Sequence, residues 1–160
     1  MTWRLRRCAR PAAGALLVAF VSLACGESPA SPGSGAAPVS PSPQGIPVTM
    51  QAVAGSGVTG NAVITKAAGS FTVKLTLTGM KANSQHANHI HKGSCAKPGP
   101  IDKSLQTISA DASGSGTQTS TVPSDFAIPT EGWYVNVHTG PDITQPGQGA
   151  SVSCGDIPTA

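Results

Sequence analysis

Strict alternation of apolar and polar side chains is the feature that most constrains this 160-residue chain. From Phe71 to Leu77 every second residue is apolar, and threonine or lysine occupies each position between. Successive side chains of a β-strand point to opposite faces, so the pattern predicts a strand with one face on a core and the other in water. After residue 46 no segment keeps helical periodicity for two turns, and we therefore expect an all-β fold.

Further short segments with strand character recur along residues 46–160, separated by turns rich in glycine, proline and serine. We expect strands over 48–53, 62–65, 71–78, 105–112, 116–122, 133–138 and 151–154. About seven or eight short strands with such turns are typical of an antiparallel sandwich or flattened barrel. Residues 46–160 are therefore predicted to form a single antiparallel β domain.

The first 24 residues have the layout of a secretory signal peptide. Four arginines and no acidic residue lie within residues 1–10, and a nearly continuous apolar run follows over 12–24. A basic segment, a short apolar run and small residues at its end are typical of export signals. A retained transmembrane helix is the less favoured alternative, because spanning a bilayer takes about 20 apolar residues.

Cys25 follows Ser22, Leu23 and Ala24, and this segment resembles a bacterial lipobox, in which the cysteine receives a lipid and becomes the first mature residue. Position 22 departs from the usual leucine, and ordinary signal peptidase, which would leave Cys25 without lipid, also fits. Residues 26–45 hold five prolines, five serines and four glycines, a composition that cannot bury enough apolar surface to fold. A tether directly behind the cysteine favours the lipid. We therefore expect a disordered linker over 25–45 and a lipid-anchored protein of the bacterial cell envelope, in the periplasm or at the cell surface.

The net positive charge of the chain comes from its predicted signal peptide. The formal net charge is +3, but all four arginines precede residue 11. After residue 24, six lysines face seven acidic residues, which leaves a charge near −1. Nucleic-acid binding requires a basic patch. We therefore expect no nucleic-acid partner, and membrane contact through the lipid alone.

Two of the four cysteines remain for the folded domain. Cys8 leaves with the signal peptide and Cys25 is assigned to the lipid, so Cys95 and Cys154 are left. Cysteines of exported proteins meet an oxidising compartment, which favours a disulfide between these two. Two thiolate metal ligands are the alternative, although single cysteines lack the paired spacing of thiolate sites.

The histidines fall in two short segments, with His86, His89 and His91 in one and His138 in the other. In a strand, His89 and His91 share one face while Ile90 points to the opposite face. If the two segments pair as strands, three imidazoles meet on one surface, and neutral imidazole is a good ligand for copper or zinc. His86 is the weak candidate, because its odd spacing turns it away unless the strand starts or bulges after it.

A plainer interpretation of these residues stays open. Histidines on strands are often solvated or hydrogen-bonded side chains, and a single His-x-His pair also arises by chance. Tyr134 and Asn136 share the predicted face of His138, and we interpret them as supporting polar residues rather than ligands.

Three segments resemble copper/zinc superoxide dismutase: Gly79-Met80, residues 89–95 (His-Ile-His-Lys-Gly-Ser-Cys) and residues 153–156 (Ser-Cys-Gly-Asp). The resemblance implies a Greek-key β-sandwich. It also implies copper ligands at His89, His91 and His138, together with a disulfide between Cys95 and Cys154. Residues 89–91 (His-Ile-His) and 134–139 (Tyr-Val-Asn-Val-His-Thr) are similar to the CHRD (chordin) domain of bacterial exported proteins as well.

Two departures from the dismutase pattern argue against that enzyme. No histidine lies between His91 and His138, where the family places its bridging histidine and the remaining zinc histidines. The resemblance therefore predicts no zinc site, and it leaves copper without a fourth ligand unless His86 supplies one. Ser151 stands three residues before the second cysteine, where the family has an arginine that guides the anion to copper.

The sequence therefore predicts a protein that binds one copper ion, for copper handling or buffering in the envelope. A copper-only superoxide dismutase and a metal-free CHRD interaction module are the alternatives. No residue is predicted to be catalytic, since no other catalytic motif has the required spacing. Protein partners cannot be named from these residues.

Overall fold

The computed structural model describes residues 45–159, and within that range the secondary structure consists of β-strands without a helix. The predicted signal peptide, the linker up to residue 44 and Cys25 lie outside the described residues. No helix in the described part has the length and apolarity that a membrane crossing requires. Ten strands follow in order: β1 (Ile46–Ala52), β2 (Thr59–Ala67), β3 (Ser70–Thr78), β4 (Gln85–His86), β5 (Asn88–Gly93), β6 (Pro98–Ser104), β7 (Ile108–Ser109), β8 (Gly116–Val122), β9 (Trp133–His138) and β10 (Ser151–Ile157).

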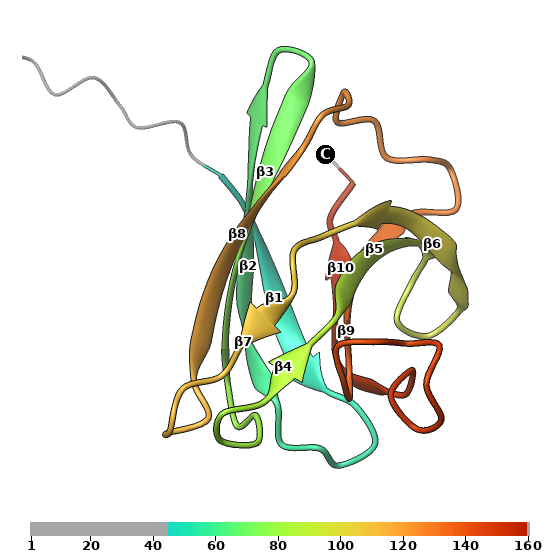
Figure 1. The fold of residues 1–160 in the computed structure, drawn as a ribbon. Coiled ribbons are helices and arrows are strands. Elements are labelled where there is room, and N and C mark those ends of the chain that lie inside the picture. Colours follow the sequence, from blue (N-terminus) through green and yellow to red (C-terminus); the bar gives the residue numbers. More distant parts are fainter. Residues whose placement is uncertain (1–44, 160) are drawn as a thin grey trace, which may run out of the picture. The chain divides into compact units, whose positions relative to one another are not determined.

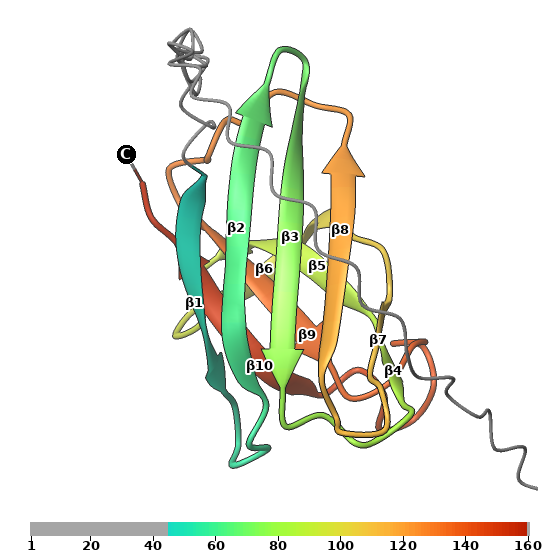
Figure 2. The ribbon, with the colours of Figure 1, turned by 90° about the vertical axis from the view of Figure 1, so that its left-hand side faces the viewer.

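Eight of these strands form one curled antiparallel sheet in the order β6-β5-β9-β10-β1-β2-β3-β8. The sheet folds into two facing layers, with β1, β2, β3 and β8 in one and β6, β5, β9 and β10 in the other (Figures 1 and 2). The chain crosses between the layers after β3, after β6 and again after β8. The predicted all-β, dismutase-like sandwich is confirmed.

The two layers join where β1 meets β10, through the pairs Gln51 with Cys154 and Ala52 with Ser153. Gly155 allows this close approach. A Cβ atom at this position would lie 2.5 Å from the carbonyl oxygen of Thr49, closer than real Cβ contacts. The short strands β4 and β7 pair with each other outside the large sheet.

The core lies between the layers and is built by alternation. In β3 the four apolar residues from Phe71 to Leu77 are buried, and the residues between them are partly or fully exposed. From the second layer, β5 contributes Ile90, and β9 contributes Val135 and Val137. The periodicity of residues 71–78 therefore predicted both the strand and its buried face correctly.

One predicted strand is misplaced. Residues 105–112 contain only the two-residue strand β7, whereas β6 occupies residues 98–104, which were not among the predicted strands. Pro98 and Pro100 suppress a strand signal because proline cannot donate to a sheet ladder. The fold tolerates both prolines since β6 is an edge strand that pairs with β5 alone.

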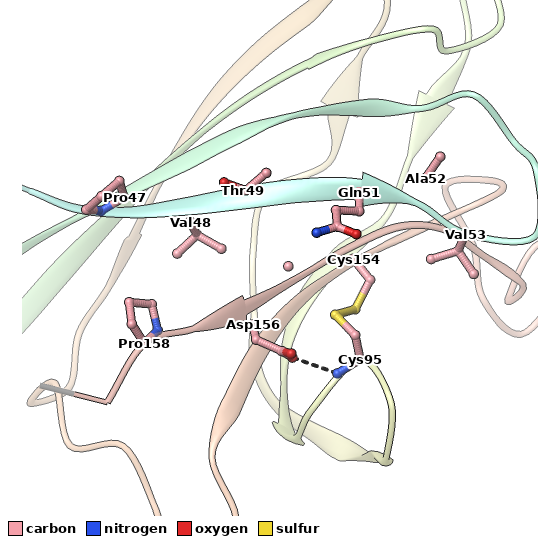
Figure 3. A pocket seen from close by; sticks show the side chains of 11 residues that line it. Pro47, Val48, Thr49, Gln51, Ala52, Val53, Cys95, Cys154, Asp156 and Pro158 are labelled. Carbon is pink, nitrogen blue, oxygen red and sulfur yellow. Dashed lines mark hydrogen bonds between the residues drawn. A yellow bond between two sulfur atoms is a disulfide. The ribbon is translucent and has the colours of Figure 1, made fainter.

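Cys95 and Cys154 form a disulfide in the structure, with their Cα atoms 5.9 Å apart (Figure 3). The bond links the turn after β5 to β10, 59 residues further along the chain. The carboxylate of Asp156 accepts a hydrogen bond of 2.7 Å from the Cys95 backbone N–H. These groups line a hollow of about 460 Å³ beside β1. The disulfide thus fixes the segment behind the His-x-His strand to the last strand of the same layer.

Candidate metal centre

Strands β5 and β9 lie side by side, and their register brings the histidines together. His89 is opposite Asn136, and His91 is opposite Tyr134. Since side chains alternate along a strand, these four residues and His138 share the face of the layer that points away from the core. The local sequence folds this way because the valines and isoleucine between them are buried in the core.

The three imidazole rings converge on one point. The ring centroids of His89 and His138 are 5.2 Å apart, and His91 lies 5.9 Å from His89 and 5.8 Å from His138. One ring nitrogen of each histidine lies within 4.8 Å of the nitrogens of the other two. This spacing could hold a metal ion, and His86 does not belong to the group.

Two backbone carbonyls hold the rings of His91 and His138. The Nδ1 atom of His91 lies 2.9 Å from the carbonyl oxygen of Gly99, and that of His138 lies 2.8 Å from the carbonyl oxygen of Gly149. A carbonyl oxygen only accepts hydrogen bonds, so both Nδ1 atoms carry the proton. Each Nε2 atom therefore keeps a lone pair, and a metal-binding histidine is commonly oriented in this way.

The remaining ring nitrogens fit a metal ion. The Nε2 atom of His91 and the Nδ1 atom of His89 are buried and have no hydrogen-bond partner. Buried polar atoms in proteins are nearly always paired, so each exception requires an explanation. A metal ion held by His89, His91 and His138 would supply the partner that these two atoms lack.

The electrostatics keep two of these rings neutral. The pKa of His89 is lowered from 6.5 to about 4, chiefly by burial and in addition by the neighbouring His138 and His91. Burial also lowers the pKa of His138, against the opposing effect of its hydrogen bond to Gly149. Neutral imidazole is the form that binds a metal, so both rings are ready to coordinate at pH 7.

His86 is buried apart from the other histidines, and both of its ring nitrogens are engaged. Nδ1 lies 2.7 Å from the carbonyl oxygen of His138, and Nε2 lies 2.8 Å from the hydroxyl of Ser84. Strand phase turned His86 away from the other histidines unless the strand started after it, and a new strand does start after Ala87, so phase does not carry across. His86 therefore has no free nitrogen for a metal. Its ring instead hydrogen-bonds to the backbone of His138, which belongs to the candidate site.

Polar neighbours complete the site. The ring of Tyr134 stacks on His91 with centroids 5.1 Å apart. The Nδ2 atom of Asn136 lies 3.4 Å from His138 Nε2. The hydroxyl of Ser151 donates a hydrogen bond to the Oδ1 atom of Asn136. Sequence reasoning missed the Gly99 and Gly149 carbonyls, because a backbone atom leaves no residue signature.

The model of the CHRD domain family matches residues 34–142, more than half of the chain. The chain belongs to this family. The CHRD match includes all four histidines, and it ends before Ser151 and Cys154 on β10. The candidate metal centre of this CHRD protein therefore combines ligands inside the family match with supporting residues beyond it. No curated protein matches the sequence.

Solved structures resemble this CHRD domain in fold. Cu/Zn superoxide dismutase from Brucella abortus matches with a TM-score of 0.53 at 22% identity, over 70% of this chain and 98% of that one. A SOD-like protein from Bacillus subtilis matches with a TM-score of 0.56 at 17% identity, over 71% of this chain and 99% of that one. A double mutant of a SOD-like protein from Bacillus subtilis, with two histidines introduced, gives 0.58 at 18% identity, over 72% and 99%. At these identities the likeness concerns the fold.

Proposed function

We propose that this CHRD protein is an exported, lipid-anchored protein that binds one copper ion and serves copper handling or buffering in the bacterial envelope. His89, His91 and His138 would hold the ion. The anchor would be a lipid on Cys25, with residues 26–45 as the tether between the membrane and the domain.

One observation carries the metal-binding part of the proposal: three neighbouring histidines each turn one ring nitrogen toward the same point, and two of these nitrogens have no partner. His89 Nδ1 and His91 Nε2 are buried without partners, and His138 Nε2 has only a contact of 3.4 Å to an amide. In a cluster of solvated or structural histidines, water or protein groups would be expected to pair with both nitrogens of each ring.

Copper suits this donor set better than the other common ions. Imidazole ligands are used by copper and zinc, whereas calcium and magnesium prefer oxygen ligands. Copper binds nitrogen ligands more tightly than zinc does in the general order of metal affinities. When bound, copper would supply one-electron redox chemistry. The protein's own contribution is to hold three neutral imidazoles at fixed orientation.

Superoxide dismutation is the second candidate, and the likeness to Cu/Zn superoxide dismutase from Brucella abortus favours it. Ser151, whose hydroxyl contacts Asn136, stands where the dismutase family has its anion-guiding arginine. The missing positive charge weakens both the attraction of an anion and the stabilisation of charge during reaction. We therefore place copper handling ahead of dismutation.

Copper titration of the purified mature protein tests the proposal. We expect about one copper per chain. Changing His89, His91 or His138 to alanine should weaken binding by more than the 10–100-fold that loss of a residue outside the ligand shell typically costs. His86→Ala is the matched control, since it removes a nearby histidine without removing a ligand.

The same preparation separates the alternatives. Absence of copper uptake by the wild-type protein would contradict the proposal and leave the metal-free interaction module. Tight copper with slow superoxide turnover supports copper handling. Turnover near the diffusion limit of about 10⁸–10⁹ M⁻¹s⁻¹ would promote the dismutase instead.

A further inference from the structure

Asn136 is a buried polar residue beside the histidine cluster. It is opposite His89 in the ladder and shares a face with His138. Only 6% of its surface is exposed. A buried amide must satisfy both its oxygen and its NH₂ group, so its surroundings are informative.

The hydrogen bonds around Asn136 fix which end of its amide faces the site. Gly149 forces the proton of His138 onto Nδ1, so Nε2 carries a lone pair. An amide oxygen pointing at that lone pair would be repelled. The NH₂ group therefore points toward His138 Nε2, and the amide oxygen accepts the hydrogen bond from Ser151.

Metal binding changes this arrangement. The Nε2 atom of His138 lies 3.4 Å from the Nδ2 atom of Asn136. A metal ion bound to this Nε2 atom would use its lone pair. The buried NH₂ group then loses its acceptor, which is unfavourable unless another acceptor takes its place. Three histidines also leave copper short of the four ligands of its usual tetragonal geometry. A small acceptor bound to the metal would satisfy both requirements together.

We propose that Asn136, held in orientation by Ser151, donates a hydrogen bond to a small acceptor that binds the metal as its fourth ligand. The ligand class is water, hydroxide or a small anion with an oxygen or nitrogen acceptor. The inference rests on the proposed copper site. In this arrangement Asn136, oriented by Ser151, would give the site a neutral hydrogen-bond donor. The dismutase family has a charged arginine for guiding the anion instead.

Azide binding to the copper-loaded mature protein tests this role. Azide is a small anionic acceptor, and its binding to Cu(II) is followed by a charge-transfer absorption band and by electron paramagnetic resonance. Asn136→Leu keeps the shape of the side chain and removes the donor. We expect it to bind one copper as before and to bind azide about tenfold or more weakly, as loss of a hydrogen bond to a charged group does.

Two further variants make the test specific. Asn88→Leu is the matched control, because Asn88 is also a buried asparagine of this layer but points to the other face of β5 and donates to the Gln106 carbonyl. It should leave azide affinity unchanged. Ser151→Ala frees the Asn136 amide to rotate and should weaken azide binding in the same direction, by less. If Asn136→Leu does not fold, Ser151→Ala decides the question.

The outcomes distinguish the two levels of the proposal. Normal copper uptake with azide affinity unchanged in Asn136→Leu, or in Ser151→Ala where only that variant folds, overturns the role of Asn136 alone. An equal loss of azide affinity in Asn88→Leu also overturns it, because the effect would then be general. A wild-type protein that takes up no copper overturns the proposed function, and this inference with it.

Discussion

The Nδ1 atom of His86 lies 2.7 Å from the backbone carbonyl oxygen of His138, and this hydrogen bond ties β4 to the end of β9. The residue between β4 and β5 strengthens the connection. Ala87 accepts a hydrogen bond from the His138 N–H and donates one to the carbonyl of Gly140. The backbone of His138 is therefore held from one segment, while its ring is held by Gly149.

We predict that His86→Ala destabilises the domain by about 1–3 kcal/mol, because it leaves the buried His138 carbonyl short of a hydrogen bond. His86→Asn should restore part of the loss, since its amide NH₂ can reach the position of Nδ1. Chemical denaturation measures the stability, and a copper competition titration measures the site. A loss of copper affinity as large as that of His138→Ala would mean that His86 is a ligand.

The faces of the two histidine strands could be predicted from the sequence because strand phase depends only on residue spacing. His89 and His91 are two residues apart with a buried isoleucine between them, and His138 follows the buried Val137. Neither argument needs the rest of the fold. The pairing of β5 with β9 could not be derived from phase, and only the family resemblance implied it.

The supports of the site could not be predicted. Gly99 and Gly149 contribute carbonyl oxygens, and any residue at those positions has one. Gly99 also lies in β6, whose prolines resemble a loop. Strand phase could not place His86, because two short strands separated only by Ala87 have the sequence pattern of one continuous strand.

Acid should destabilise the metal-free domain between about pH 6.5 and pH 4. The pKa of His89 is 6.5 in the unfolded chain and about 4 in the folded domain, and that of His138 is also lowered on folding. In this window the unfolded chain binds protons that the folded domain does not. Stability is therefore complete above pH 6.5 and falls as the pH approaches 4.

Denaturation midpoints of the metal-free protein, measured at half-unit steps from pH 7.5 to 4, check this prediction. His89→Gln should show a shallower fall, because it removes one of the titrating rings. Hydrogen bonds lower the pKa values of Asp111 and Asp142 below 3.8. Their contribution to the pH dependence of stability therefore lies at lower pH than that of the histidines. A fall of equal steepness in wild type and His89→Gln would contradict the assignment.

Removing the disulfide should lower the stability of the domain substantially. Cys154→Ser opens a loop of 59 residues, which in the chain-entropy model costs roughly 3–5 kcal/mol. The double change of Cys95 and Cys154 to serine should cost no more than the single change, because one bond is lost in both. Denaturant unfolding gives the values. Alkylation of both thiols in protein from an oxidising compartment would show that the bond does not form in the cell.

The mature chain is predicted to begin at Cys25 and to carry a lipid. Intact mass spectrometry of the membrane fraction should show the loss of residues 1–24 and the addition of acyl chains. Stable anchoring of a protein requires more than one acyl chain, each methylene contributing about 0.8 kcal/mol, so the added mass should correspond to several chains. Cys25→Ala should release the protein from the membrane fraction while leaving the denaturation midpoint of the domain unchanged, because the linker precedes the first strand at Ile46. A soluble mature form that starts elsewhere and has no acyl mass would show that ordinary signal peptidase cleaves the chain, and the domain would then act without a membrane anchor.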